Sequence, residues 1–182
     1  MTELCKIAAK WRTDKTGSYS SFYHTLFEHR RNEIKKVLEI GIGSMQAMKH
    51  VPDYRVGASL FMWEEYFPNA MIYGLDIAPE TLISIDRIRT RQCDQSSVSQ
   101  LLEAACWAGG KFDLILDDGS HQVGDQLLTA MTLMPFLREG GLFIIEDVNE
   151  LEAVSAKLPF EHAVIQYKYQ PTLTGRLILM RK

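Results

Sequence analysis

The sequence predicts an α/β protein with an open, mostly parallel seven-stranded sheet, an antiparallel last strand and helices on both faces. Three observations lead to this fold class. Short apolar runs alternate with amphipathic helical patterns along most of the chain. Several runs are apolar at nearly every position, as in strands covered on both faces, and several end on acidic residues. The last two apolar runs flank a short polar stretch, which predicts a hairpin.

The composition indicates a single globular domain. The 182 residues are 46% hydrophobic and 24% charged, with a formal net charge of −3. We expect one domain over residues 1–182, with a helical cap or flap at 1–34 and an α/β core at 35–182. The acidic balance argues against a nucleic-acid partner, which would require a basic face.

The cysteines and the hydropathy pattern predict a cytoplasmic location. Cys5, Cys93 and Cys106 lack the spacing of a zinc site and are odd in number, so we expect reduced thiols. No signal peptide is recognisable, and no run is apolar and long enough to cross a bilayer, so we expect no membrane partner.

Helices and strands can be placed in chain order. Amphipathic patterns predict helices over residues 2–11, from a cap at Ser20 or Ser21 to about 31, over 57–67, from caps at 94–97 to 106, after 121 to about 138, and over 150–157. Apolar runs predict strands over 37–40, 70–76, 86–92, 112–116, 142–145, 162–169 and 176–180, with a turn at 172–175. Polar residues 12–19 are either a solvated connector or a flap, in which Thr13 and Lys15 could meet a carboxylate.

The stretch from Val37 to Gly43 is the one best suited to a ligand site. An apolar strand reaches Glu39 and is followed by two glycines one residue apart, Gly41 and Gly43. Glycine permits positive φ and close approach of the backbone to a ligand, whereas a carboxylate is unsuited to phosphate. Neither phosphate motif is present, because Gln46 stands where the dinucleotide fingerprint needs glycine and no Gly-Lys-Ser/Thr follows. We expect a cationic or amine-bearing ligand; the alternative is a plain tight turn.

Acidic residues also end the later strands. Asp76 could accept both hydroxyls of a ribose at the second strand's end. Asp118, Glu146 and Asp147 follow the next two parallel strands, so their carboxylates should converge at one edge of the sheet. Without a cation this would raise one or more of their pKa values, whereas Mg²⁺ prefers oxygen ligands of this kind. The alternative is a capping pair at one strand end.

Seven strings in order carry a family resemblance. They are Lys10-Trp11-x-Thr13-Asp14-Lys15, Val37-Leu38-Glu39-Ile40-Gly41-Ile42-Gly43, Gly57-Ala58-Ser59-Leu60-x-Met62-Trp63, Ile72-Tyr73-Gly74-Leu75-Asp76-Ile77, Asp94-Gln95-Ser96, Asp117-Asp118-Gly119-Ser120-His121 and Gly140-Gly141-Leu142-x-x-x-Glu146-Asp147. Together they resemble class I S-adenosylmethionine-dependent methyltransferases over roughly residues 8–150. More narrowly, they resemble the metal-dependent sugar O-methyltransferases of antibiotic biosynthesis, of mycinamicin, macrocin and rhamnosyl-tetracenomycin type.

The resemblance implies a Rossmann-like class I methyltransferase fold and an S-adenosylmethionine- and Mg²⁺-dependent (or Mn²⁺-dependent) O-methyltransferase. Its acceptor would be a hydroxyl of a sugar or a glycosylated natural product. Glu39, Gly41 and Gly43 would lie along the methionine part of the cofactor, with Ser59 and Lys15 as further candidates for its carboxylate. The ribose would lie at Asp76, and the adenine at Asp94 and Gln95, although Asp94 could also be a plain N-cap. Ile77 and Asp117 complete the implied cofactor site.

The resemblance also assigns Asp118, Glu146 and Asp147 as metal ligands. The position of His121, three residues after Asp118 and directly after Gly-Ser, favours it as the base; the alternative is a structural histidine at a helix N-cap. His121 lies at the expected start of a helix, whose positive end should keep the imidazole neutral. It could then take the proton of a metal-bound sugar hydroxyl as the oxygen attacks the sulfonium methyl group. The remaining histidines lack such a context and read as surface or packing residues: His24, His29, His50 and His162.

The match departs from the family in places. Only residues 148–158 separate the Glu-Asp pair from the next strand, where relatives carry a long aromatic substrate loop; residues 44–56 could supply part of the acceptor wall. Ser97 stands where relatives often have an acid. The alternatives are a protein of the cephalosporin hydroxylase-like group acting on another small molecule, or a non-catalytic scaffold. By family habit, apolar residues of the first helices could form a homodimer face.

Overall fold

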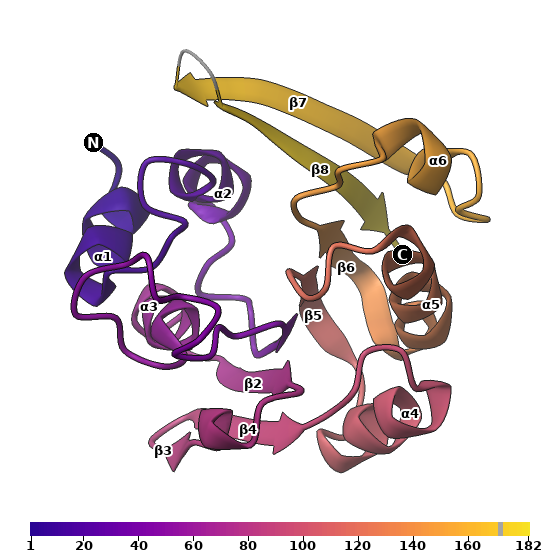
Figure 1. Cartoon of the computed structure of the whole chain (residues 1–182), viewed down its shortest axis with the longest axis horizontal. Helices are drawn as coiled ribbons and strands as arrows, with labels where there is room; N and C mark the ends of the chain where they lie inside the picture. The colour runs from indigo at the N-terminus through magenta and orange to yellow at the C-terminus, as the bar shows by residue number, and fades with distance from the viewer. Residues whose placement is uncertain (171–172) are drawn as a thin grey trace.

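A computed structural model describes residues 1–170 and 173–182, and it contains one eight-stranded sheet with helices on both faces (Figure 1). The strand order is β3-β4-β2-β1-β5-β6-β8-β7. Strands β4, β2, β1, β5 and β6 are parallel, whereas β8 runs antiparallel to both β6 and β7. The strand bounds are β1 Lys36–Ile40, β2 Met71–Asp76, β3 Ser84–Ile85, β4 Ile88–Gln92, β5 Phe112–Asp117, β6 Leu137–Ile145, β7 His162–Gln170 and β8 Leu173–Arg181.

The predicted fold class is confirmed, with one strand more than expected. Strand β3 is only two residues long and pairs antiparallel with the N-terminal end of β4. Two residues are too few to show a period of two, so the sequence gives no signal for this strand. Asp86, predicted to begin the third parallel strand, instead lies in the turn between β3 and β4 with a φ of 47°.

Two layers of helices cover the sheet (Figure 1). Helices α1 Glu3–Trp11, α2 Ser20–Phe27 and α3 Ala58–Tyr66 lie on one side, and α4 Val98–Trp107, α5 Val123–Leu133 and α6 Leu151–Ser155 lie on the other. Two short 3₁₀ helices, η1 Pro79–Thr81 and η2 Met134–Phe136, complete the set. Each layer seals one face of the sheet with its own hydrophobic cluster.

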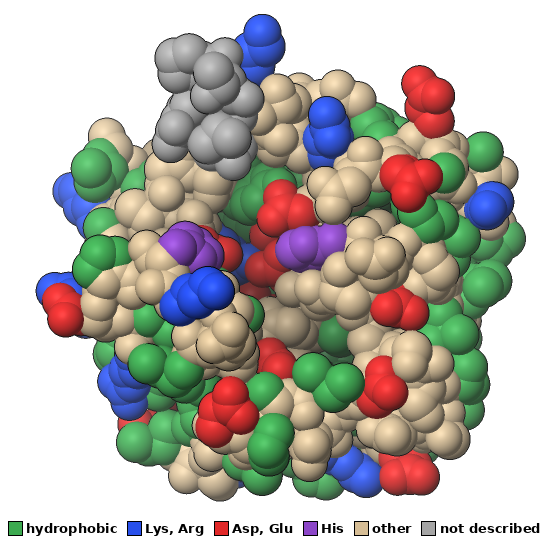
Figure 2. All heavy atoms as spheres, in the orientation of Figure 1, with side chains coloured by type: hydrophobic (Ala, Val, Ile, Leu, Met, Phe, Trp, Pro, Cys, Tyr) green, Lys and Arg blue, Asp and Glu red, His purple; other side chains and the backbone are tan. Residues whose placement is uncertain are grey.

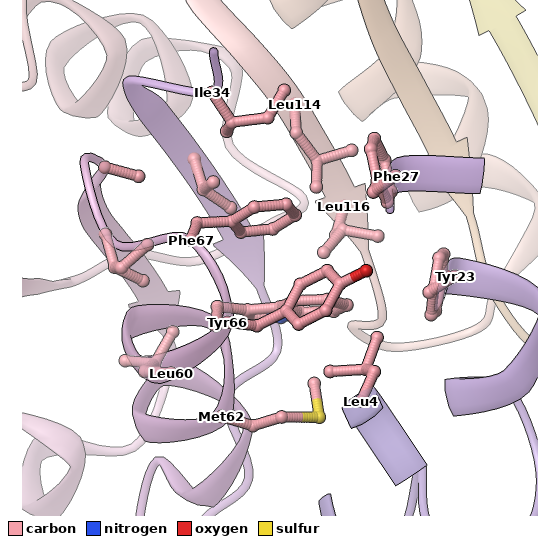
Figure 3. Packing of buried hydrophobic residues seen from close by; sticks show 14 of the residues in the cluster. Leu4, Tyr23, Phe27, Ile34, Leu60, Met62, Tyr66, Phe67, Leu114 and Leu116 are labelled. Atoms are coloured by element: carbon pink, nitrogen blue, oxygen red, sulfur yellow. The ribbon is translucent and has the colours of Figure 1, made fainter. Parts of the chain in front are cut away.

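The first layer is built into the core rather than resting on it (Figure 3). Leu4 of α1 and Tyr23 and Phe27 of α2 are fully buried. The ring of Tyr23 meets Trp63 of α3 edge-on, with 5.3 Å between centroids. Aromatic rings in this geometry stabilise each other beyond their buried area. Residues 1–34 are therefore held to the sheet by side-chain packing.

The same packing bears on the predicted homodimer face. The large apolar side chains of α1 and α2 are buried or half-buried against the first cluster, as Ile7, Phe22 and Leu26 illustrate. The exposed apolar residues expected there are thus used within the chain, and the homodimer stays a prediction.

Several helix boundaries differ from the predicted ones. The residue before α2 is Tyr19, which makes no side-chain cap, and the Oγ of Ser20 instead contacts the Sγ of Cys5 at 3.2 Å. Helix α2 ends at Phe27 rather than near residue 31. Helix α5 ends at Leu133, because Pro135 follows within η2 and cannot continue the α-helix.

The predicted C-terminal hairpin is present, with longer strands than expected. Thr174 pairs with Lys168, and Gly175 with Tyr167, so both residues belong to β8 and not to the turn. The predicted turn at 172–175 also includes Thr172, which lies outside the described residues. Among the described residues, no helix is long and apolar enough to span a membrane.

Gly41 is required by the fold itself. Its φ is +78°, and a Cβ there would lie 2.0 Å from the backbone oxygen of Asp118 on the neighbouring strand end. The backbone hydrogen bonds are in keeping with this close approach, since the N–H of Asp118 donates to the carbonyl of Ile40 at 2.8 Å. The glycine thus lets the ends of β1 and β5 approach each other, whereas the sequence suggested only close approach to a ligand.

Gly41→Ala is expected to lower the free energy of unfolding by about 3 kcal/mol or more, because positive φ and a backbone clash act together. Gly124→Ala is the matched control: position 124 lies in α5, with nothing within 4 Å of an added Cβ. That change should raise stability by about 0.5–1 kcal/mol. Urea unfolding at 25 °C measures the stability of both variants. Equal stabilities would contradict the requirement for glycine at position 41.

Candidate functional site

A cavity of about 810 Å³ opens at the carboxyl edge of the parallel strands. Its wall is formed by the segments that follow β1, β2, β4, β5 and β6, together with residues 13–14. Figure 2 shows this hollow near the centre of one face, with acidic side chains deep inside it and histidines at its rim. Ligands of open α/β sheets bind in this place, because the strand ends and helix starts converge there.

One end of the cavity combines a carboxylate with an apolar surface. Asp76 ends β2; its Oδ2 accepts the N–H of Ile42 at 3.1 Å and its Oδ1 that of Ala78 at 3.0 Å. These two bonds fix the plane of the carboxylate and leave a lone pair free on each oxygen. Ile77 next to it is 64% exposed and lines the cavity. A diol and a flat apolar group fit side by side here.

The loop after β1 is held open by a tyrosine. The Tyr54 hydroxyl lies 3.1 Å from the carbonyl oxygens of Ile42 and Gly43. A Cβ on Gly43, whose φ is +79°, would come within 2.2 Å of that hydroxyl. Tyr54 thus braces the glycine loop from the segment 44–56, which also lines the cavity through Met48 and His50.

Asp94 and Gln95 have different environments. Asp94 is half-buried, and its Oδ1 accepts both the N–H and the Oγ–H of Ser96, which lowers its pKa. It is not the N-cap of α4; that role belongs to Ser97, whose Oγ accepts the N–H of Gln100. Asp94 therefore keeps its outer oxygen available at the cavity wall.

The side-chain amide of Gln95 makes hydrogen bonds to other residues of the protein. Its Nε2 donates to Asp117 Oδ1 at 2.7 Å and to Thr129 Oγ1 at 3.0 Å, and its Oε1 accepts the N–H of Ser120 at 2.8 Å. The side chain is 8% exposed and touches the cavity. It therefore joins the loop after β4 to the loop after β5, and adenine recognition through its amide would break these bonds.

Three predicted cofactor residues lie behind the cavity wall. Glu39, Asp117 and Lys15 are buried and do not contribute to the lining. Burial raises the pKa of both carboxyls to about 7. The charge of Lys15 lowers the pKa of Glu39, and the Gly119 N–H lowers that of Asp117, but burial has the larger effect. Ser59 reaches the lining, but its Oγ donates to Glu39 Oε2 at 2.8 Å. Glu39, Asp117 and Lys15 therefore support the wall of the cavity from behind, and Ser59 lies between Glu39 and the cavity.

Lys15 is the centre of the buried charges. Its Nζ lies 2.8 Å from Asp118 Oδ2, 2.9 Å from Glu146 Oε2 and 3.5 Å from Glu39 Oε1. Burial opposes its charge, but the three carboxylates raise its pKa well above the usual value. Burial raises the pKa of Glu146, and one ammonium cannot neutralise three carboxylates, so the cluster favours retaining a proton.

A second cluster faces the cavity. Ligand atoms of Asp118, His121 and Asp147 lie within 4.8 Å of one another, and all three residues line the cavity. His121 Nε2 is 3.2 Å from Asp118 Oδ1, and the Tyr19 hydroxyl donates to Asp147 Oδ1. Asp118 and Asp147 are thus brought together as predicted, with His121 beside them.

Glu146 is not part of this cavity-facing cluster. Its Oε1 accepts the Tyr23 hydroxyl at 2.6 Å, and its Oε2 contacts Lys15. Of the three carboxylates predicted to converge, Asp118 and Glu146 meet at the Lys15 ammonium, whereas Asp118 and Asp147 meet at the cavity. The sequence placed Glu146 at the right strand end and could not show which way its side chain turns.

The environment of His121 differs from the expected one. Helix α5 begins at Val123 with Gln122 as its cap residue, so His121 lies in the preceding loop, with a φ of 58°. Its hydrogen bond to Asp118 raises its pKa, an effect opposed by burial and reinforced by the charges of Asp118 and Asp147. The prediction of a lowered pKa from the helix end was therefore wrong, because nearby carboxylates outweigh a helix dipole.

Sequence reasoning missed several residues of the site. Tyr19 and Tyr23 contact the acidic residues after β6, and His50 and Tyr54 line the cavity, although His50 was read as a surface or packing residue. Nothing in the periodicity of α2 marks a tyrosine as a hydrogen-bond donor to residues more than 120 positions away. The other histidines keep their predicted role; His162, for example, contacts Ser155 Oγ at 2.7 Å.

Comparison with known proteins places this geometry in a family context. No protein-family model matches the chain. It is 39% identical over 150 residues to the 8-demethyl-8-(2-methoxy-alpha-L-rhamnosyl)-tetracenomycin-C 3'-O-methyltransferase of Streptomyces olivaceus, covering 80% of this chain and 37% of that protein. It is 37% identical over 149 residues to the mycinamicin VI 2''-O-methyltransferase of Micromonospora griseorubida, covering 80% and 36%. The chain is a homologue of sugar O-methyltransferases.

The solved structures agree. The MycE methyltransferase of the mycinamycin biosynthetic pathway, in complex with Mg, SAH and mycinamycin VI, superposes with a TM-score of 0.79 at 27% identity, covering 100% of this chain and 54% of that one. The Rossmann-like methyltransferase fold is thereby confirmed. The present chain spans little more than a third of the length of the curated relatives that it matches.

Gln95→Ala is expected to lower the free energy of unfolding by about 2–3 kcal/mol, because the buried Asp117 Oδ1 would lose the shorter of its two hydrogen bonds and the Ser120 N–H would lose its acceptor. Gln46→Ala, at an exposed position, should change it by less than about 0.5 kcal/mol. Denaturant titration of the two variants provides the measurement. If Gln95→Ala were as stable as Gln46→Ala, Gln95 would be free to serve a ligand.

Proposed function

We propose that the chain is an S-adenosylmethionine-dependent and Mg²⁺-dependent O-methyltransferase that acts on a sugar hydroxyl of a glycosylated natural product. One observation carries this proposal. A single cavity holds a ribose-type site at Asp76 and an acid–histidine cluster at Asp118, His121 and Asp147. Its homology to enzymes named as sugar O-methyltransferases supports the proposal.

The cavity fits S-adenosylmethionine in one direction. The free lone pairs of Asp76 suit the two ribose hydroxyls, and exposed Ile77 suits one face of the adenine ring. Asp94 lies at the same wall, within reach of the adenine edge. The methionine end would then lie along Gly41 and Gly43, which line the cavity, with the buried Glu39 behind them.

A divalent metal fits the cluster at the other end. Asp118 and Asp147 supply oxygen atoms within 4.8 Å of one another, and oxygen is the ligand type that Mg²⁺ prefers. His121 lies beside the two carboxylates, and an ion that prefers oxygen ligands would leave its imidazole free. When bound, the metal would lower the pKa of a sugar hydroxyl and orient it.

His121 is proposed to accept the proton of that hydroxyl. Its ring lines the cavity, and its Nε2 is held 3.2 Å from Asp118 Oδ1. A positive φ at His121, and another of 48° at Asp147, set both side chains in strained loops, as is common where side chains must be aimed. A cation between the carboxylates would offset the charge that now raises the histidine pKa.

The acceptor is proposed to enter from the rim formed by residues 44–56. His50 and Met48 line the cavity there. The relatives named above are named for methylation of a rhamnosyl-tetracenomycin and of mycinamicin VI. A sugar presents vicinal hydroxyls to the carboxylate cluster, whereas its aglycone would remain near the rim.

The first test is calorimetric titration of S-adenosylmethionine into the chain in Mg²⁺ and in EDTA. Binding is expected in both, since Asp76 and the metal cluster lie at opposite ends of the cavity. Asp76→Ala should weaken binding about tenfold or more, through loss of the ribose contacts. Glu80→Ala, an exposed acid on η1, is the matched control and should bind as the parent does. Absence of binding in every condition would overturn the proposal.

His121→Ala should lower kcat for methyl transfer to rhamnosides by about 10²–10⁴-fold, the usual contribution of a general base. Affinity for S-adenosylmethionine should change less than threefold. His29→Ala, 90% exposed on the surface, should have parental kcat. Transfer of a labelled methyl group measures all three proteins. A His121→Ala variant that lost cofactor binding instead would assign the histidine a structural role.

A further inference from the structure

Lys15 carries a positive charge into the interior of the protein. It lies in the segment between α1 and α2, and its side chain is 1% exposed. Burying an ammonium group is unfavourable unless hydrogen bonds and opposite charges replace its hydration shell. Here three carboxylates do so, at 2.8, 2.9 and 3.5 Å from Nζ.

These carboxylates come from three different strands. Glu39 belongs to β1, Asp118 follows β5 and Glu146 follows β6, and these strands are adjacent in the sheet. The lysine therefore joins the ends of β1, β5 and β6 from the side of the N-terminal segment. Of the three, Asp118 is the one that also faces the cavity and contacts His121.

We propose that Lys15 is a positioning residue, which holds Asp118 in the orientation that presents its second oxygen to His121 and to a bound cation. The inference rests on the different partners of the two Asp118 oxygens: Oδ2 accepts a hydrogen bond from Lys15, whereas Oδ1 lies next to His121. The proposal deepens the function proposed above and rests on it for the role of His121. The ion-pair cluster itself exists whatever the enzyme methylates.

The N-terminal segment supplies two further contacts of the same kind. Tyr23 donates to Glu146 Oε1, and Tyr19 to Asp147 Oδ1. Residues 15–23 thus contact the carboxylates that follow both β5 and β6. This segment completes the acidic end of the cavity from behind, which a detachable flap would not do.

Removing Lys15 has a consequence that divalent cations should reverse. Without its charge, Glu39, Asp118 and Glu146 would be buried close together and uncompensated, with mutual repulsion. A cation bound at Asp118 would replace part of the missing charge. A merely space-filling role for the lysine stem would give no such dependence on cations.

The test compares Lys15→Met, similar in length and uncharged, with Lys6→Met, which removes an exposed lysine of the same N-terminal segment. Thermal midpoints are measured for the full chain in 10 mM MgCl₂, and in KCl of equal ionic strength with EDTA. In KCl, Lys15→Met should melt at least about 10 °C below the parent, as expected for loss of a buried charge partner. MgCl₂ should raise its midpoint by several degrees more than it raises that of the parent or of Lys6→Met.

The result that overturns the proposal is a Lys15→Met midpoint equal to that of Lys6→Met, or one that Mg²⁺ raises no more than it raises the parent. If Lys15→Met does not fold, the variant Lys15→Met/Glu146→Gln decides, because it removes one charge of each sign. The double variant should fold if Lys15 acts through its positive charge. Failure to fold would mean that Lys15 acts only through side-chain packing, which would overturn the proposal. These readouts need no acceptor, so failure of the methyltransferase proposal would show separately, as absent cofactor binding.

Discussion

The buried charge cluster around Lys15 is the interaction on which the site depends. Three carboxylates end adjacent strands of one sheet, and two of them are almost completely buried. Such a set is unfavourable in a protein interior unless a positive charge is placed among them. The chain provides that charge from a segment far away in sequence, and the position of Asp118 follows from it.

This arrangement links the two layers of the molecule. The segment that carries Lys15 is held by α1 and α2, which pack through Leu4, Tyr23 and Phe27 into the core on one face of the sheet. The cavity lies at the strand ends, and its loop after β5 is tied by Gln95 to the loop after β4. Packing on one side and a hydrogen-bonded amide on the other therefore set the same loop, residues 117–121.

The two ends of the cavity suit different chemistry because their environments differ. At Asp76 the carboxylate is half-buried and oriented by backbone N–H groups, so its remaining lone pairs can accept hydroxyls. At Asp118 and Asp147, side chains from the N-terminal segment take one oxygen each and leave the other for the cavity. A ligand that spans the cavity would meet a binding end and a reactive end.

The sequence by itself determined the order of strands and helices, the glycine loop and the acids at the strand ends. These features depend on local periodicity and on residues adjacent in the chain, such as Glu39 with Gly41, or Asp118 with His121. The tertiary structure alone decided which acids face the cavity. Glu146 turns to Lys15 and Tyr23, Asp117 to Gln95, and His121 toward carboxylates that raise its pKa. The physical reason is that side-chain direction and charge balance arise from tertiary contacts, some of them more than 100 residues apart, as between Glu146 and Lys15, which no local pattern encodes.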